Sequence, residues 1–159
     1  MKREKFLWAL TGGHHEGLVV SRVIQKIATA IEGDGTGKFL DKLPQKVTKF
    51  FKEGLEPHFR AEEELMETFG GHVGKKDADL QRLFSDHRHL KSLLREGSLE
   101  SLAAFATELD EHIRFEESQL FPRLERTLTQ AEKEAAALLL EETIPTGLAL
   151  KRPETAKEA

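Results

Sequence analysis

Two short stretches of this chain decide how its fold is interpreted: residues 58–62 read HFRAE and residues 112–116 read HIRFE. Each stretch places a histidine four residues before a glutamate, so on a helix both side chains lie on one face. The rest of that face is apolar, and a carboxylate on a buried apolar stripe is costly unless its charge is compensated. Because the arrangement occurs twice, we expect a compensating cation. The two stretches therefore predict a His/Glu metal site inside a helical bundle.

The composition restricts the chemistry that such a site can use. The chain has 159 residues, enough for one domain with a sizeable core, and it contains neither Cys nor Tyr. Any metal must therefore be bound by His, Asp or Glu. The net charge of −4 gives no indication of nucleic-acid binding. Because there is also no apolar run of membrane-spanning or signal-peptide length, we expect a cytoplasmic protein that binds neither nucleic acid nor membranes.

Apolar residues recur with helical periodicity in four long segments, separated by glycine-rich breaks at residues 33–37, 70–74 and 97–98. The predicted helices span residues 13–32, 41–69, 77–96 and 98–121. Gly97 is the expected stop of the third helix and Ser98 the expected N-cap of the fourth. Short connections between long helices favour antiparallel neighbours. The predicted fold class is therefore all-α, an antiparallel up-down-up-down four-helix bundle.

Prolines and composition predict how the helices are interrupted and how the chain ends. Pro57 lies inside the second predicted helix and is expected to kink it or to free a backbone carbonyl, whereas Pro122 is expected to disturb or end the fourth. Residues 129–142 are predicted to form an extra C-terminal helical segment. We therefore expect one bundle domain over residues 1–142 and a flexible tail over residues 143–159.

Each of the four helices offers at least one histidine on its apolar face. On the first helix, either of two adjacent histidines could lie on the apolar face. His15 is followed at four-residue steps by apolar residues, whereas His14 is followed by a more polar set. The apolar line continues through Val19, Val23 and Ile27, and the polar line through Leu18, Ser21 and Gln25. The pattern therefore predicts that His15 faces inward, while His14, His72 and His89 are interpreted as surface or outer-sphere residues.

Antiparallel alternation brings six inward groups to one end of the bundle interior. The predicted metal ligands are His15, His58, Glu62, His87, His112 and Glu116. A lone inward histidine is more often an ordinary core residue than a ligand, so the interpretation rests on the whole set. Six such ligands are too many for one tetrahedral zinc ion but suit two metals that share the carboxylates. The neighbouring Glu63, Asp86 and Glu117 are interpreted mainly as solvated charges, one of which can orient a ligand imidazole.

The order of these residues resembles the hemerythrin-like (HHE cation-binding) family. Residues 112–122, HIRFEESQLFP, are similar to that family's closing motif, and residues 15–18, HEGL, look like its opening motif. The resemblance covers residues 11–125 and implies a four-helix bundle around a non-haem di-iron centre, with other divalent metals possible. Its members bind or sense dioxygen, nitric oxide or peroxide, or store or sense iron. Carried over by position, the ligands are the six residues named above.

One departure from the family bears on function. The oxygen carriers of the family have a second histidine one turn away on the third helix, where this chain has Leu83 and Lys91. The resemblance then implies fewer protein ligands and more open coordination positions, which favours reactivity or sensing over reversible oxygen carriage. The expected ligand is a small diatomic molecule or a peroxide. Whether the protein is an enzyme is left open, and the sequence identifies no protein partner.

Two other interpretations remain beside a reactive di-iron protein. The first is a metal-stabilised regulatory or iron-sensing interaction module without redox chemistry. The second is a ferritin-like oxidase, which ranks low because such bundles use a glutamate three residues before a histidine. The residues three before His58, His87 and His112 are Leu55, Phe84 and Leu109. A zinc protease is also disfavoured, because no His-Glu-x-x-His run occurs.

Overall fold

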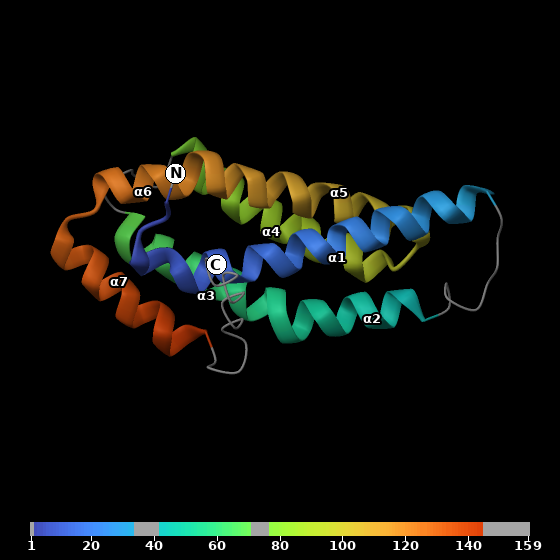
Figure 1. The fold of residues 1–159 in the computed structure, drawn as a ribbon, viewed down its shortest axis with the longest axis horizontal. Coiled ribbons are helices and arrows are strands. Elements are labelled where there is room, and N and C mark those ends of the chain that lie inside the picture. Colours follow the sequence, from blue (N-terminus) through green and yellow to red (C-terminus); the bar gives the residue numbers. More distant parts are fainter. Residues whose placement is uncertain (1, 34–41, 71–76, 145–159) are drawn as a thin grey trace, which may run out of the picture.

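The structure, a computed structural model, describes residues 2–33, 42–70 and 77–144, and the regular structure in these ranges is helical (Figure 1). The prediction of an all-α chain is confirmed. In chain order the elements are the short 3₁₀ turn η1 (Lys5–Leu7), α1 (Trp8–Gly33), α2 (Leu43–Phe50), the π-helical turn η2 (Phe51–Leu55), α3 (Glu56–Phe69), α4 (Ala78–Glu96), α5 (Leu99–Phe115), the π-helical turn η4 (Glu116–Leu120), α6 (Phe121–Thr127) and α7 (Gln130–Thr143).

The long helices lie lengthwise beside one another. Helix α1 packs against α5, α5 against α4, α4 against α3, and α3 against α1, so these four close a ring around a common interior. Figure 1 shows α2 and α3 as one continuous rod, and likewise α5 and α6, while α7 folds back across α3 near the N-terminus. In the described part of the chain, no helix is both long enough and apolar enough to cross a membrane.

Local sequence explains most of the helix ends. Asp77 caps α4 by accepting hydrogen bonds from the backbone N–H groups of Asp79 and Leu80. At its other end, Gly97 has a φ of 65°, a left-handed conformation that glycine adopts without steric cost. Ser98 accepts from the Ser101 N–H, so the predicted stop and cap are confirmed. Helix α1 differs from prediction, because it begins at Trp8 rather than near residue 13.

The two prolines produce the same local structure at both places. Each follows a five-residue π-helical turn by two positions: η2 ends at Leu55 before Pro57, and η4 ends at Leu120 before Pro122. A proline lacks the N–H that the preceding turn needs, and a π turn accommodates the lost hydrogen bond without ending the helix. Pro122 therefore disturbs the helix, as expected, but the chain stays helical to Thr127.

The apolar core is divided into two clusters with a polar layer between them. On α1, Leu10 belongs to one cluster and Ile24 to the other, with His14 between them. On α4, Leu83 and Leu90 flank His87 in the same way. The ionisable groups therefore lie in the interior between two apolar clusters, not at one end of the bundle as predicted, because η1, α6 and α7 extend the core beyond them.

Several predictions fall outside the described residues. These are most of the loop at 33–37, the loop at 70–74 beyond Gly70, His72, and the tail from residue 145 onward. Thr143 ends α7, and Ile144 still packs into the cluster that contains Leu140.

Candidate metal centre

Three histidines and two glutamates predicted from sequence meet in the polar layer, together with one histidine that was not predicted. They form two groups of four residues that share both glutamates. The first group is His14, His58, Glu62 and Glu116, and the second is Glu62, His87, His112 and Glu116. Within each group one ligand atom per residue lies within 4.8 Å of all the others, and all six residues are buried.

Helix geometry positions each glutamate beside the histidine one turn before it. His58 Nε2 lies 2.7 Å from Glu62 Oε1 on α3, and His112 Nε2 lies 2.8 Å from Glu116 Oε1 at the start of η4. These short i,i+4 contacts follow from the four-residue spacing of each histidine and glutamate on one helix face. Sequence periodicity alone was therefore sufficient to find these two pairs.

The second oxygen of each carboxylate faces a histidine from another helix. Glu62 Oε2 lies 3.1 Å from His87 Nε2 on α4, and Glu116 Oε2 lies 2.9 Å from His14 Nε2 on α1. Each carboxylate thus directs one oxygen into each group of four. The Nε2 atoms of His14 and His58 are 3.2 Å apart, and those of His87 and His112 are 3.1 Å apart.

Each of the four carboxylate oxygens of the cluster lies 2.7–3.1 Å from an imidazole Nε2 atom, as an ion pair. All four oxygens of Glu62 and Glu116 are buried, and none of them has a hydrogen-bond partner in the described structure. Buried carboxylate oxygens are normally paired, because an uncompensated one is costly. Nitrogen and oxygen atoms that converge in this way are the arrangement expected of ligands around a cation.

Outer carboxylates hold three of the four imidazoles from behind. His14 Nδ1 lies 2.7 Å from Glu117 Oε1, and His87 Nδ1 lies 2.8 Å from Glu63 Oε1. A carboxylate only accepts, so in each case the Nδ1–H group donates, and the neutral ring keeps the lone pair on Nε2. The same contact, at 3.0 Å, joins His112 Nδ1 to Asp86.

More carboxylates contact the imidazoles than the sequence predicted. Glu63, Asp86 and Glu117 were interpreted mainly as solvated charges, but each one contacts an imidazole on a neighbouring helix. Helical periodicity relates residues only within one helix, so these particular contacts between helices did not follow from it. Such carboxylate–imidazole pairs orient metal-binding histidines and increase their basicity.

Without a bound cation, the cluster balances its own charges. Burial favours the neutral form of His112, but the charge of Glu116 and the hydrogen bond to Asp86 outweigh it and raise the His112 pKa to about 10. Burial would likewise raise the pKa of Glu62, yet His58, His14 and His87 hold it well below its usual range. The interior is therefore built to keep its carboxylates ionised, and a metal ion can replace the positive charge that protons supply.

The prediction that His15 faces inward is wrong. His15 is exposed, whereas the adjacent His14 is 5% exposed and lies in the cluster. Two members of the apolar line used to orient His15 face solvent, with Val19 44% exposed and Val23 50% exposed, and only Ile27 packs against the core.

Small residues on the buried face of α1 explain this error. The face runs through Leu10, His14, Gly17, Ser21 and Ile24. An added Cβ on Gly17 would lie 2.8 Å from Ile113 Cδ1, and Ser21 Oγ donates to the Ala106 carbonyl. Close approach of α1 to α5 thus requires small or hydrogen-bonding residues. Because such residues are not hydrophobic, the apolar pattern of the sequence does not mark this face as buried. The three- and four-residue spacing of this line was the signal that could have found His14.

Two aromatic rings not singled out from sequence flank the cluster. Phe59 stacks on His87 with ring centroids 3.9 Å apart, and Phe121 stacks on His14 at 5.4 Å. Both phenylalanines are buried. They fix the ring planes and keep this part of the interior apolar around the ionisable groups.

The comparison with protein families agrees with this geometry. The family model described as the hemerythrin HHE cation binding domain matches residues 10–124. This chain belongs to the hemerythrin HHE family. Searches of curated proteins and of solved structures gave no match.

The family match and the cluster support one conclusion about this hemerythrin-like chain. The matched residues include all six members of the cluster, and the donor set consists of nitrogen and oxygen atoms able to hold metal ions. The histidine of α1 in the cluster is His14, which immediately precedes the opening motif at residues 15–18, rather than His15. The centre is therefore a His/Glu metal-binding cluster inside a helical domain.

Proposed function

We propose that this protein binds two iron ions and that the resulting centre binds, senses or reacts with dioxygen, peroxide or nitric oxide. In this proposal the chain is an antiparallel up-down-up-down four-helix bundle that holds one ion between His14 and His58 and the other between His87 and His112. The observation that carries the proposal is the division of each buried carboxylate between the two groups. In this proposal Glu62 and Glu116 would each hold both ions.

The residues of the chain have separate tasks in this function. The four imidazoles offer Nε2 lone pairs, and the outer carboxylates Glu63, Asp86 and Glu117 hold three of the rings by accepting from Nδ1–H. The two apolar clusters on either side limit the access of water. A bound pair of iron ions would supply the redox and ligand-binding chemistry at this place.

The number of protein ligands favours reactivity. Each position receives two imidazoles and one oxygen from each of two carboxylates. One turn to either side of His87 lie Leu83, which is buried and apolar, and Lys91, so α4 offers no second histidine at those positions. The other histidine of α4, His89, is exposed and contacts Glu108. Metal sites with fewer protein ligands keep positions for water or an exogenous ligand. We therefore propose a small diatomic molecule or peroxide as the ligand.

The test is an optical titration of protein loaded with Fe²⁺ under anaerobic conditions. We expect near-ultraviolet and visible absorption that changes on exposure to dioxygen, peroxide or nitric oxide. Glu62→Gln keeps the side-chain volume but removes the shared charge, and it should abolish that change. Glu64→Gln is the matched control, because Glu64 is exposed on the same helix and should leave the response intact. A loaded wild-type protein whose spectrum is indifferent to all three ligands would contradict the reactive function.

That contradictory result would favour the second candidate, a metal-stabilised regulatory or iron-sensing module without redox chemistry. The buried carboxylates support this candidate equally, because they need a cation whether or not it is redox-active. Under it, chelation lowers the melting temperature while redox ligands change nothing.

The setting of the protein is also part of the proposal. We also propose that the protein lies in the cytoplasm and has no nucleic-acid or membrane partner. Its net charge of −4 supports the absence of a nucleic-acid partner.

A further inference from the structure

The two groups of four correspond to each other residue by residue. His14 on α1 corresponds to His87 on α4, and His58 on α3 corresponds to His112 near the end of α5. The outer carboxylates follow the same correspondence: Glu117, next to Glu116, holds His14, and Glu63, next to Glu62, holds His87. The centre is therefore approximately symmetric in its inner and outer contacts.

The two groups differ at one imidazole, that of His58. Asp86 immediately precedes His87 and accepts from His112 Nδ1 at 3.0 Å. The residue that immediately precedes His14, in the equivalent place, is Gly13. Among the described residues no carboxylate contacts His58 Nδ1, which faces the backbone of α1. His58 is thus the one ring of the four without an outer carboxylate in the described structure.

Gly13 leaves no room for such a partner. A Cβ added to Gly13 would lie 2.9 Å from His58 Nδ1, closer than carbon and nitrogen atoms approach without a bond. Any side chain at this position, including an aspartate equivalent to Asp86, would have to displace the imidazole. Gly13 is therefore the reason that His58, unlike His112, has no outer carboxylate in the described structure.

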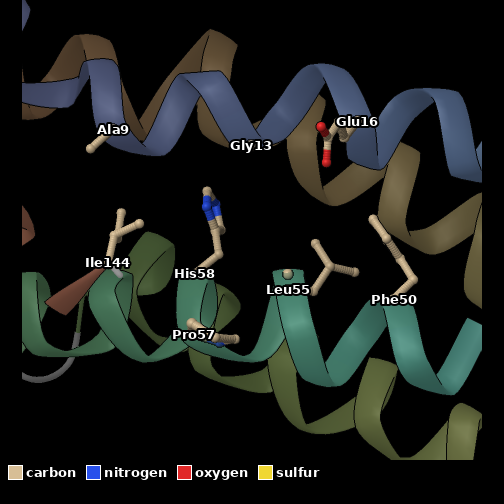
Figure 2. Close-up of a pocket in the computed structure, with 9 residues that line it drawn as sticks. Ala9, Gly13, Glu16, Phe50, Leu55, Pro57, His58 and Ile144 are labelled. Carbon is tan, nitrogen blue, oxygen red and sulfur yellow. The ribbon is translucent and has the colours of Figure 1, made fainter. Parts of the chain in front are cut away.

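A small cavity opens at the same place. It has a volume of about 40 Å³ and lies between α1 and the η2–α3 segment, and its lining includes Gly13, Pro57 and His58. Figure 2 shows the His58 ring projecting from α3 toward Gly13, with its nitrogens at the α1 side of the gap. Of the six residues in the cluster, His58 alone lines this cavity. A space of this size is large enough for a water molecule.

We propose that the two metal positions are unequal, and that the position formed by His14 and His58 binds its ion more weakly and exchanges it first. This inference rests on the proposed two-metal centre. Loss of an outer partner typically lowers metal affinity about 10- to 100-fold, because the ring is less well oriented and less basic. The position formed by His87 and His112 has both partners, and the position formed by His14 and His58 has one. The cavity gives solvent a route to the weaker position.

The test is a titration of metal-free protein with Co²⁺ under anaerobic conditions, followed by the visible absorption of the bound ion in competition with a chelator. We expect two steps whose dissociation constants differ by about 10- to 100-fold. His58→Ala should remove the weak step and keep the tight one. Gly13→Ala should do the same, although alanine favours the helix more than glycine does, because the added methyl group displaces His58.

The counterpart variant is Asp86→Asn, which removes the anionic partner of His112. It should weaken the tight step about 10- to 100-fold, so that the two steps approach each other. Asp110→Asn is its control, because Asp110 pairs with Arg114 on the same exposed face and contacts no imidazole. Circular dichroism of each variant verifies that the helices are retained.

The possible failures separate the two proposals. Two equal steps in the wild type, or loss of the tight step in His58→Ala or Gly13→Ala, would overturn the inequality while leaving the two-metal centre in place. An Asp86→Asn isotherm identical to that of the wild type would overturn it as well. Folded wild-type protein that binds no Co²⁺ would instead contradict the proposed metal centre, on which this inference depends.

Discussion

At the scale of single residues, function depends on which of two adjacent histidines faces inward. His14 lies 2.9 Å from Glu116 and 3.2 Å from the His58 ring, whereas His15 is exposed. We predict that His14→Ala lowers the bound iron from about two ions to about one per chain, because one position loses a ligand. His15→Ala is the matched control and should retain the wild-type value. The measurement is iron content after loading and desalting, and equal losses in both variants would contradict the assignment.

Residue patterns within one helix located most of the site. The pairs His58/Glu62 and His112/Glu116 follow from their spacing alone, and His87 follows from its apolar neighbours. His14 was missed because Gly17 and Ser21, which share its buried face, are not apolar. Their burial depends on how closely α1 approaches α5, a property of two helices that no single-helix pattern contains.

At the scale of elements, the N-terminal segment is held to the site by Arg3. Its guanidinium donates to the Glu117 carboxylate at 2.9 Å, to the Glu117 carbonyl at 2.7 Å, and to Glu125. Glu117 in turn accepts from His14, so the arginine fixes a carboxylate that orients an imidazole.

Arg3→Ala should therefore lower the free energy of unfolding of the metal-free protein by about 1–3 kcal/mol, because it leaves half-buried acceptors without their donor. Urea unfolding measures this change. Lys2→Ala, at an exposed neighbouring position, should change it by less than about 0.5 kcal/mol. An Arg3→Ala chain as stable as the Lys2→Ala chain would show that the contact contributes nothing.

The start of α4 provides a second prediction at this scale. Asp77 caps the helix and also accepts from Arg123 on α6 at 2.6 Å, and this hydrogen bond, with the backbone ones, lowers its pKa. We expect Asp77→Ala to lower the free energy of unfolding by about 1–2 kcal/mol at neutral pH. Asp110→Ala, which removes an exposed i,i+4 pair, should have an effect of about 0.3–0.5 kcal/mol.

The sign of the pH dependence follows from the direction of the Asp77 shift. A carboxyl whose pKa is lower in the folded state stabilises the fold above its unfolded pKa of about 3.9, and this stabilisation is lost as the pH falls through the folded value. The difference between wild type and Asp77→Ala should therefore be constant from pH 7 to about pH 5 and shrink below about pH 4. Urea unfolding across this range measures it, and a difference that grows on acidification would contradict the assignment.

Helix positions were easier to predict than helix irregularities. The ends at Gly97 and Ser98 have local causes and were found from sequence. The two prolines were expected to disturb their helices, but the form of the disturbance, a π turn that lets the helix continue, depends on packing on both sides. The extra turn of α1 from Trp8 forms because η1 and α7 cover its start, a contact between segments far apart in sequence.

At the scale of the whole molecule, the metal centre is a polar layer between two apolar clusters. The stability of the fold depends on which charges lie in this layer, because four buried carboxylate oxygens have no hydrogen-bond partner in the part of the chain that the structure describes. A ligand that binds only the folded state stabilises it by about 2.7 kcal/mol when its free concentration is 100 times its dissociation constant. We therefore predict that chelation of the loaded protein lowers its melting temperature by several degrees. Differential scanning calorimetry measures this shift, and the His14→Ala/His58→Ala double variant should show a smaller one.

The proposed function depends on two ions that share Glu62 and Glu116. The most direct test is the iron content per chain, measured by elemental analysis after loading with excess Fe²⁺ under anaerobic conditions and desalting. A centre in which these glutamates hold both ions predicts about two irons per chain in the wild type and a loss of iron in Glu62→Gln but not in Glu64→Gln. Wild-type protein that retains no iron, or only one ion that Glu62→Gln leaves in place, would contradict it.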